Sequence, residues 1–341
     1  MSAPRDPVAD LRRIAFLLER AHESTYRVRA FRGAAAALRG RAPDELAALA
    51  ASGELRRLRG VGDVTAKCVA ESLAGEEPVY LSRLQATEGA ALADAAADLR
   101  AAVRGDCHSH TDASDGGSPL PEMVETARDL GHEYLVITDH SPRLTVANGL
   151  SPQRLRAQLR DVAELNEALV DSGFRVLTGI EVDILDDGSL DQEPDLLAEL
   201  DVVVASVHSK LRMPAAEMTE RMLTAVANPH VDVLGHCTGR MVTGNRKRPE
   251  SQFDAAAVFA ACAEHGVAVE INSRPERLDP PKRLLELAVD TGCLFTIDTD
   301  AHAPGQLDWL DAGCARAAAC GVPEERVLNT WPVERLLARQ R

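Results

Sequence analysis

From Gly105 onward, short runs of apolar and β-branched residues alternate with longer segments in which apolar residues recur at helical spacing. Short runs of this kind predict buried strands, and the longer amphipathic segments predict helices. After a short first strand near 103–107, the predicted strands are 134–138, 175–180, 202–207, 231–235, 267–271 and 294–298. The predicted helices between them include 120–130, 153–171, 215–227, 254–265 and 281–291. Alternation of this kind predicts an α/β fold with a parallel sheet. Seven units favour a distorted (β/α)7 TIM-like barrel, with a doubly wound open sheet as the alternative.

The first hundred residues show helical spacing without β-branched runs. Four helical stretches, 8–21, 26–39, 43–51 and 63–73, are separated by glycines. We therefore predict a small all-α domain over residues 1–90, a linker over 91–104 and the barrel over 105–341.

Composition limits the class of protein. An apolar fraction of 45% in 341 residues allows a sizeable core. No apolar run approaches the ~18 residues that a membrane span needs, and the first residues lack the pattern of a secretory signal. Seven cysteines without a CxxC pair favour reduced thiols. These features predict a cytoplasmic protein without a membrane partner.

The net charge of −15 is unevenly distributed. Residues 1–60 carry 12 Lys and Arg against 7 Asp and Glu, so the acidic excess lies later in the chain. A basic first segment suggests contact with nucleic acid, although a solvated helical surface explains the charge equally well. The acidic second part would repel phosphate unless bound cations reversed the local field.

Histidines and carboxylates follow the predicted strands of the barrel. The carboxyl ends of parallel barrel strands meet at one rim, where such enzymes keep their chemistry. Alternate residues of a strand end face the same side, so a His-x-His or Asp-x-His pair can bind one ion. Six of the ten histidines lie at such ends. The nine candidate ligands are His108, His110, Asp115, His140, Glu181, His208, His236, Asp300 and His302.

Mixed imidazole and carboxylate ligands suit Zn²⁺, Mn²⁺ or Fe²⁺. Taken singly, each histidine is better explained as a capped or hydrogen-bonded residue at a strand end. Together, nine ligands exceed the four of one structural zinc and suffice for two or three divalent metal ions if one carboxylate bridges. Such sites activate water and hold the oxygens of a phosphoryl group. Hydrolysis of a phosphoester is therefore the predicted reaction.

The segments that carry these residues resemble the motifs of the polymerase and histidinol phosphatase (PHP) family. They read HSHTDASDG, ITDH, GIEVDIL, SVH, GHC and DTDAH. The resemblance implies a (β/α)7 barrel with three metal ions. The implied ligand sets are His108, His110, Glu181 and Asp300 for the first ion, Glu181, His208 and His236 for the second, and Asp115, His140 and His302 for the third.

Residues 270–279 resemble a segment in the PHP domains of bacterial family X DNA polymerases, which implies a phosphate contact. Arg277 and Asn272 are the candidates, because a guanidinium matches phosphate oxygens bidentately. The alternative for Arg277 is a salt bridge with Glu276 or Asp279. The predicted catalytic residues are Glu181, Asp300, Arg277 and Asn272. Lys210, Arg212 and Arg240 also follow ligand-bearing strands, and Asp139 is predicted either to orient an imidazole or to cap a helix.

Residues 58–66 (LRGVGDVTA) resemble the hairpin of a helix-hairpin-helix motif. Gly60 and Gly62 would let backbone N–H groups approach a DNA phosphate at a helix start, without reading its sequence. Residues 26–35 resemble a basic helix of family X polymerases, so Arg27, Arg29 and Arg32 are predicted DNA contacts. A solvated basic helix is the alternative.

The chain departs from the family X pattern in two ways. Between the two regions there is no room for the polymerase catalytic domains, so we do not predict polymerisation. The position of the lyase lysine in that family holds Cys68, next to Lys67, and this argues against lyase chemistry.

These features predict a metal-dependent phosphoesterase that acts on DNA ends or gaps, as a 3′→5′ exonuclease or a 3′-phosphatase. The first alternative is a phosphatase of a small phosphorylated substrate, such as histidinol phosphate or a nucleotide. The second is a DNA-binding protein without catalytic activity.

Overall fold

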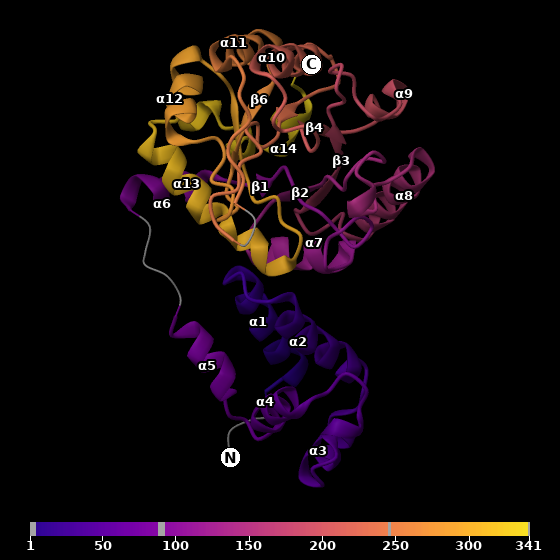
Figure 1. Cartoon of the computed structure of the whole chain (residues 1–341). Helices are drawn as coiled ribbons and strands as arrows, with labels where there is room; N and C mark the ends of the chain where they lie inside the picture. Colours follow the sequence, from indigo (N-terminus) through magenta and orange to yellow (C-terminus); the bar gives the residue numbers. More distant parts are fainter. Residues whose placement is uncertain (1–4, 88–92, 245–246, 340–341) are drawn as a thin grey trace. The chain divides into compact units, whose positions relative to one another are not determined.

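The computed structural model describes residues 5–87, 93–244 and 247–339. The chain divides into two compact units, Met1–Ala91 and Leu92–Arg341. Figure 1 shows an all-helical first unit, and a second unit in which helices surround a set of strands. No helix of the described segments is long and apolar enough to cross a membrane.

The first unit is helical, as predicted. Leu11, Ile14, Leu18 and Phe31 are buried in it at helical spacing. Four of the glycines that separate the predicted helices, Gly40, Gly53, Gly60 and Gly75, have a positive φ, which L side chains rarely adopt, so the chain turns between helices there. The elements are α1 (Pro7–Arg20), α2 (Thr25–Leu38), α3 (Pro43–Ala51), the 3₁₀ turn η1 (Leu55–Arg57), α4 (Asp63–Leu73) and α5 (Val79–Gln85).

The second unit contains a parallel sheet in which the strands follow one another in sequence order. The strands are β1 (Gly105–Asp106), β2 (Tyr134–Ile137), β3 (Arg175–Asp183), β4 (Val202–Ser206), β5 (Val233–Leu234), β6 (Ala268–Asn272) and β7 (Phe295–Asp298). Each predicted strand overlaps one of them. The sequence order of the strands is that of a barrel and excludes a doubly wound sheet, whose strand order reverses.

The sheet nearly closes between its first and last strands. A parallel bridge joins Ser109 to Ala301, and His110 N–H donates to Ala301 O at 2.8 Å. Deeper in the same seam, buried Asn329 donates to Gly105 O at 3.0 Å and to Ile297 O at 2.6 Å. The Asn329 side chain thus supplies hydrogen bonds that a strand ladder would otherwise make. The (β/α)7 barrel is confirmed.

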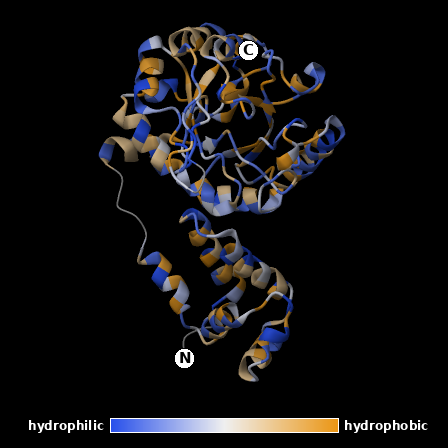
Figure 2. Cartoon of the chain, in the orientation of Figure 1, coloured by the Kyte–Doolittle hydropathy of each residue, from blue (hydrophilic) through white to orange (hydrophobic). Residues whose placement is uncertain are grey.

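Helices cover the outside of the barrel (Figure 1). Figure 2 shows hydrophobic residues concentrated on the strands, whereas the helices carry both hydrophobic and hydrophilic positions. This is the pattern of amphipathic helices packed on a buried parallel sheet. The helices are α7 (Leu120–Asp129), α8 (Pro152–Ala168), α9 (Pro194–Leu197), α10 (Ala215–Val226), α11 (Ala255–His265), α12 (Lys282–Thr291), α13 (Leu310–Ala319) and α14 (Val333–Leu337). Short 3₁₀ turns are η2 (Thr145–Ala147), η3 (Pro304–Trp309), η4 (Glu324–Arg326) and η5 (Leu328–Thr330).

The segment expected to be a linker, 91–104, contains helix α6 (Asp94–Ala102) of the second unit. Ala96 and Leu99 of α6 are buried, and Arg100 forms an ion pair with Asp311 of α13 at 3.2 Å. Most of the segment expected to be a linker is therefore a helix that packs on the second unit. The segment is short and rich in alanine, so its sequence alone gave no clear sign of the face that packs on α13.

We predict that His132 makes the second unit sensitive to acid. His132 is buried, and neither ring nitrogen has a hydrogen-bond partner among the described residues. Burial, reinforced by the charge of Arg100, lowers the pKa of His132 to about 3. The unfolded chain takes up a proton near the ordinary pKa of about 6.5, so stability falls as the pH drops below that value. Between pH 7 and 5 the free energy of unfolding should fall by about 2 kcal/mol more than in His132→Leu.

Urea unfolding at several pH values measures this difference. His265→Leu, at an exposed position of α11, is the control and should keep the wild-type pH dependence. Equal slopes in wild type and His132→Leu would show that His132 is not the acid-sensitive group.

Candidate metal centre

Glu181 lies at the centre of a cup formed by the carboxyl ends of the strands. It belongs to β3, and its carboxylate is completely buried. One oxygen, Oε2, lies 2.8 Å from His140 Nδ1, 3.4 Å from His108 Nε2 and 3.6 Å from His110 Nε2. The other oxygen, Oε1, lies 2.8 Å from His236 Nε2 and 3.2 Å from His208 Nε2. The two oxygens therefore face different sets of imidazoles, as a bridging carboxylate would.

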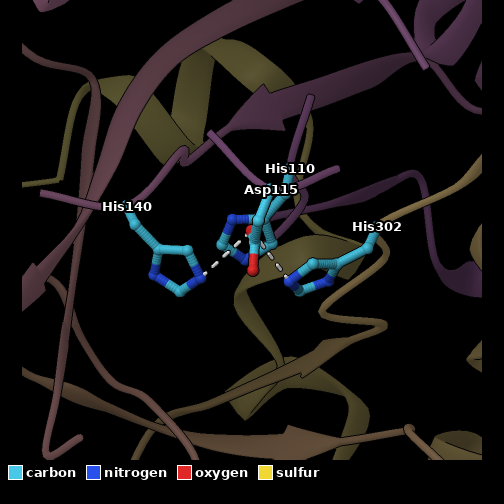
Figure 3. Close-up of side chains that lie close together, drawn as sticks. All are labelled: His110, Asp115, His140 and His302. Atoms are coloured by element: carbon cyan, nitrogen blue, oxygen red, sulfur yellow. Dashed lines mark ion pairs between the residues drawn. The ribbon is translucent and has the colours of Figure 1, made fainter. Parts of the chain in front are cut away.

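A second group of ligand-type side chains surrounds Asp115 (Figure 3). Asp115 Oδ1 lies 3.3 Å from His302 Nε2 and 3.5 Å from His140 Nε2. His110 belongs to the same group, because one of its ring nitrogens and the ligand atoms of the other three residues all lie within 4.8 Å of one another. The Asp115 side chain is 37% exposed and that of His302 is 18% exposed, whereas His108 and His110 are fully buried. The cup is therefore open on the Asp115 side.

A third group contains His108, His110 and Asp300, whose ligand atoms also lie within 4.8 Å of one another. Asp300 Oδ1 lies 3.4 Å from His110 Nε2. The backbone of Asp300 has a φ of +53°, a conformation that is uncommon for residues other than glycine. Asp300 adopts this strained conformation directly after β7, where both Asp300 and His302 lie at the rim of the barrel.

Thus the structure brings all nine predicted ligands into one cup. Ring nitrogens there lack a hydrogen-bond partner among the residues that the structure describes, including His108 Nε2, His208 Nε2 and both nitrogens of His110. Glu181 Oε2 is likewise without a hydrogen bond in the described segments. Buried polar atoms are seldom left without a partner, and borderline divalent cations coordinate imidazole and carboxylate. The residues therefore fit bound metal ions.

Further carboxylates and carbonyls hold the outward-facing ring nitrogens. His108 Nδ1 lies 2.6 Å from Glu270 Oε1, and His208 Nδ1 lies 3.2 Å from Asp183 Oδ1. His302 Nδ1 lies 2.8 Å from the carbonyl oxygen of Asp300. Such partners fix the ring orientation of metal-binding histidines. We had not predicted Glu270 or Asp183, although each lies two residues from a predicted site residue on the same strand.

The charges of the cup shift the titration of its members. Burial opposes ionisation of Glu181, but the positive charges of His208, His108 and His140 hold its pKa well below the usual range. Burial lowers the pKa of His208, but Glu181 and the hydrogen bond with Asp183 together raise it to about 9. Burial and the neighbouring imidazoles of His302 and His140 hold the pKa of His110 well below its ordinary value. The Glu181 carboxylate and the His110 imidazole are thus held in the states that bind cations, whereas the His208 imidazolium would have to release a proton to a bound cation.

Asp139 holds the loop that carries Asp115. Its carboxylate is buried and accepts hydrogen bonds from Thr111 N–H at 2.8 Å, Thr111 Oγ1 at 2.6 Å and Gln158 Nε2 at 2.5 Å. Ser114 Oγ donates to it as well. These contacts replace both predicted roles of Asp139, since its carboxylate binds Thr111 and Ser114, which precede Asp115 in the loop, rather than an imidazole or a helix end.

Arg277 contacts a predicted metal ligand. Its Nε lies 3.1 Å from Asp300 Oδ2, so the salt bridge differs from the expected alternatives with Glu276 and Asp279. Asn272 Nδ2 lies 3.3 Å from the same Asp300 oxygen. Arg274, which we had not predicted, lies 3.5 Å from Asp300 Oδ1 through Nη1. Two guanidiniums and an amide therefore line one side of the cup.

The predicted DNA-binding side chains of α2 have different environments. Arg32 forms a two-pronged ion pair with buried Glu19, at 2.8 and 2.7 Å. This pair commits Arg32 to the packing of α1 against α2, so its predicted phosphate contact is corrected. Arg27 forms an exposed pair with Glu23 at 2.7 Å. Arg29 is exposed and has no ion pair in the part of the chain that the structure describes.

The hairpin glycines have structural roles. Gly60 has a φ of +95°, and a Cβ there would lie 3.1 Å from Gly33 O of α2. Gly62 N–H donates to Thr65 Oγ1 at 2.9 Å, which caps α4. Cys68 is buried, and burial raises the pKa of its thiol to about 11, whereas Lys67 is exposed near Glu71. The Cys68 thiol is therefore not activated.

Comparisons with known proteins agree with this geometry. Residues 106–274 match the model of the PHP domain, and residues 4–77 match that of a helix-hairpin-helix domain. The DNA polymerase/3′-5′ exonuclease PolX of Bacillus subtilis is 38% identical over 227 residues, which cover 67% of this chain and 39% of that protein. A probable phosphatase of Edwardsiella ictaluri is 31% identical over 240 residues, which cover 67% of this chain and 90% of that protein.

Among solved structures, the histidinol phosphate phosphatase of Lactococcus lactis, complexed with zinc, L-histidinol and phosphate, is similar with a TM-score of 0.47 and 20% identity. The match covers 63% of this chain and 92% of that one. The fold and the histidine–carboxylate cup define a hydrolase of phosphoric esters. The chain belongs to the PHP family and is a PHP-domain phosphoesterase that carries a helix-hairpin-helix domain.

We predict that Asp139→Asn loosens the loop over residues 111–116. An amide at this position places N–H groups against the donors Thr111 Oγ1 and Gln158 Nε2, which leaves buried donors unsatisfied and costs about 1–3 kcal/mol. Hydrogen exchange read by mass spectrometry should show faster exchange of the 111–116 amides. Asp112→Asn, at an exposed position of the same loop, is the control. Unchanged protection in Asp139→Asn would contradict the assigned role.

Proposed function

We propose that this protein hydrolyses phosphate esters at DNA ends in DNA repair, as a 3′→5′ exonuclease or a 3′-phosphatase. One observation carries the proposal: a full PHP ligand set and a helix-hairpin-helix domain occur in the same chain. The similarity to Bacillus subtilis PolX supports it, although the alignment spans 39% of that protein. Its polymerase activity is not part of the proposal.

The cup would hold two or three divalent ions, of zinc, manganese or iron. His108, His110 and Asp300 would hold one, with Glu181 Oε2. Glu181 Oε1, His208 and His236 would hold a second, and Asp115, His140 and His302 a third. Bound ions would supply an activated water and neutralise the charge of the phosphate.

The protein's own cations would orient the phosphate. Arg277 is only 14% exposed, and its bond to Asp300 uses Nε, which leaves terminal N–H groups for phosphate oxygens. Arg274 is near the same carboxylate and contacts His302 Nδ1 at 3.3 Å. With Asn272 they would place the scissile phosphate at the open side of the cup.

DNA would be held by the first unit without reading its sequence. Arg29 and Arg27 on α2 and the hairpin at Gly60 and Gly62 are the proposed contacts. Arg29 has the most available charge of these, because Arg27 is already paired with Glu23.

A phosphatase of a small phosphorylated substrate is the second candidate. The observation that favours it is the Edwardsiella ictaluri relative, a probable phosphatase of which 90% aligns with two thirds of this chain.

A substrate panel distinguishes the two. With Mn²⁺, the protein should release EDTA-sensitive products from 3′-recessed, gapped or 3′-phosphorylated DNA. Arg29→Glu should weaken DNA binding and lower the slope of log KM against log salt concentration by about 1. Arg128→Glu, an exposed position of α7 in the barrel, is the control. Fast turnover of histidinol phosphate or a nucleotide without any DNA product would refute the proposal and support the alternative.

The proposed bridge predicts that Glu181→Gln loses more than one metal ion per chain. Glu181 lies within 3.6 Å of five imidazoles, so removing its negative charge weakens two ion sites at once. Elemental analysis after dialysis gives the metal content, and circular dichroism checks the fold. His302→Gln should lose at most one ion, because His302 belongs to the Asp115 group alone. Loss of a single ion from Glu181→Gln would contradict a bridging role.

A further inference from the structure

The loops that follow β5 and β6 bring several positive side chains together beside the cup. Met241 and Arg248 pair through two backbone hydrogen bonds, of 2.9 and 3.0 Å. Val242 N–H donates to Glu276 O at 2.6 Å, which anchors this segment on the loop that carries Arg277. The segment contributes Arg240, Lys247 and Arg248.

Among the residues that the structure describes, no carboxylate forms an ion pair with these three side chains. Arg240 donates from Nε to Arg277 O at 3.0 Å and from Nη2 to Leu278 O. Arg248 donates from Nε to Gly239 O at 2.5 Å. Within the described ranges, neither arginine nor Lys247 forms an ion pair, and a guanidinium has five N–H donors. Both arginines therefore keep donors and a full charge, and Lys247 is exposed.

Neighbouring arginines add to the positive field. Burial and the charge of Arg277 lower the pKa of Arg248. Burial and the charge of Arg240 lower the pKa of Arg316, on α13, to about 10. The buried carboxylate of Asp279, which accepts hydrogen bonds from Thr238 N–H and Oγ1 at 3.2 and 2.7 Å, opposes both shifts and so offsets part of this positive field.

The positive side chains are continuous with the proposed phosphate site. Arg277 contacts Asp300 with its side chain, while its carbonyl oxygen accepts a hydrogen bond from Arg240. One residue thus joins the cup to Arg240. This concentration of cations occurs in a region, 105–341, that carries 39 Asp and Glu against 22 Lys and Arg. Positive charge gathered at one place in an otherwise acidic region favours the binding of an anion there.

We propose that Arg240, Lys247 and Arg248 form a subsite for a second phosphate group of the substrate, next to the phosphate that reacts. The inference rests on the proposed phosphoesterase site and deepens it. A DNA strand carries a phosphate at every step, whereas a small monoester carries one. The subsite therefore selects polyphosphorylated substrates, without reading their bases.

The test compares substrates that differ in their number of phosphates. With Mn²⁺, kcat/KM is measured on p-nitrophenyl phosphate, on a nucleoside 3′,5′-bisphosphate and on a single-stranded oligonucleotide. In the double variant Lys247→Gln, Arg248→Gln, the preference for the oligonucleotide over p-nitrophenyl phosphate should fall about tenfold, the effect of losing charge-assisted hydrogen bonds. The slope of log KM against log salt on the oligonucleotide should fall by about 0.7 for each lost phosphate contact.

The control is the double variant Arg128→Gln, Arg175→Gln, which removes two exposed charges from the end of α7 and the start of β3. It should keep the wild-type preference. Thermal unfolding and metal content check the fold of each variant. If the double variant does not fold, Lys247→Glu alone tests the subsite, because this exposed side chain has no ion pair within the described segments.

A preference that falls for both the bisphosphate and the oligonucleotide supports a subsite for any second phosphate. A fall for the oligonucleotide alone supports a subsite for a strand. An unchanged preference on both would overturn the inference while leaving hydrolysis at DNA ends intact. If the wild type hydrolyses the bisphosphate and not DNA, the DNA-end proposal fails. The subsite is then tested by the bisphosphate alone: its preference over p-nitrophenyl phosphate should fall in the double variant.

Discussion

The site is organised around one buried carboxylate, that of Glu181. A carboxylate removed from water costs several kcal/mol unless opposite charge and hydrogen bonds compensate. Here five imidazoles surround it, and each of its oxygens faces a different set. Residues as distant in sequence as His108 and His236 are therefore held to one point. The arrangement requires β3 to extend far enough that Glu181, although at the rim, is still in regular strand pairing with Val204.

A second layer of buried carboxylates lies beneath the ligands. Asp298 Oδ1 accepts Cys107 N–H at 2.9 Å, and Asp106 accepts hydrogen bonds from His108 N–H and Thr299. Burial raises the pKa of both carboxyls, so this layer carries less negative charge than its composition suggests. These bonds connect β1 to β7 at the seam of the barrel. The same contacts that nearly close the fold thus fix the backbone that presents His108 and Asp300.

The sequence was sufficient to predict the strands and the convergence of the nine candidate ligands, because a parallel barrel brings strand ends to one place whatever the details of packing. It was insufficient wherever a role depends on a contact between distant elements. Arg32 looks like a DNA-binding residue until α1 places Glu19 against it. Asp139 adjoins His140 in sequence, yet its carboxylate binds the loop before α7. Glu270 and Asp183 look like ordinary alternating strand residues, and only the closed barrel shows which imidazoles they orient.

Phosphate recognition by an acidic barrel requires positive charge at defined places, since the region 105–341 would otherwise repel its substrate. Metal ions would supply part of that charge inside the cup, where Glu181 and Asp300 are held ionised despite burial. On one side of the cup, Arg274 and Arg277 already form ion pairs with Asp300, so this predicted ligand compensates part of their charge. In the described segments, Arg240 and Arg248 of the neighbouring loop donate from Nε to neutral carbonyl oxygens. Their field is therefore available to a substrate that extends beyond the reacting phosphate, and a single small phosphate would leave it unused.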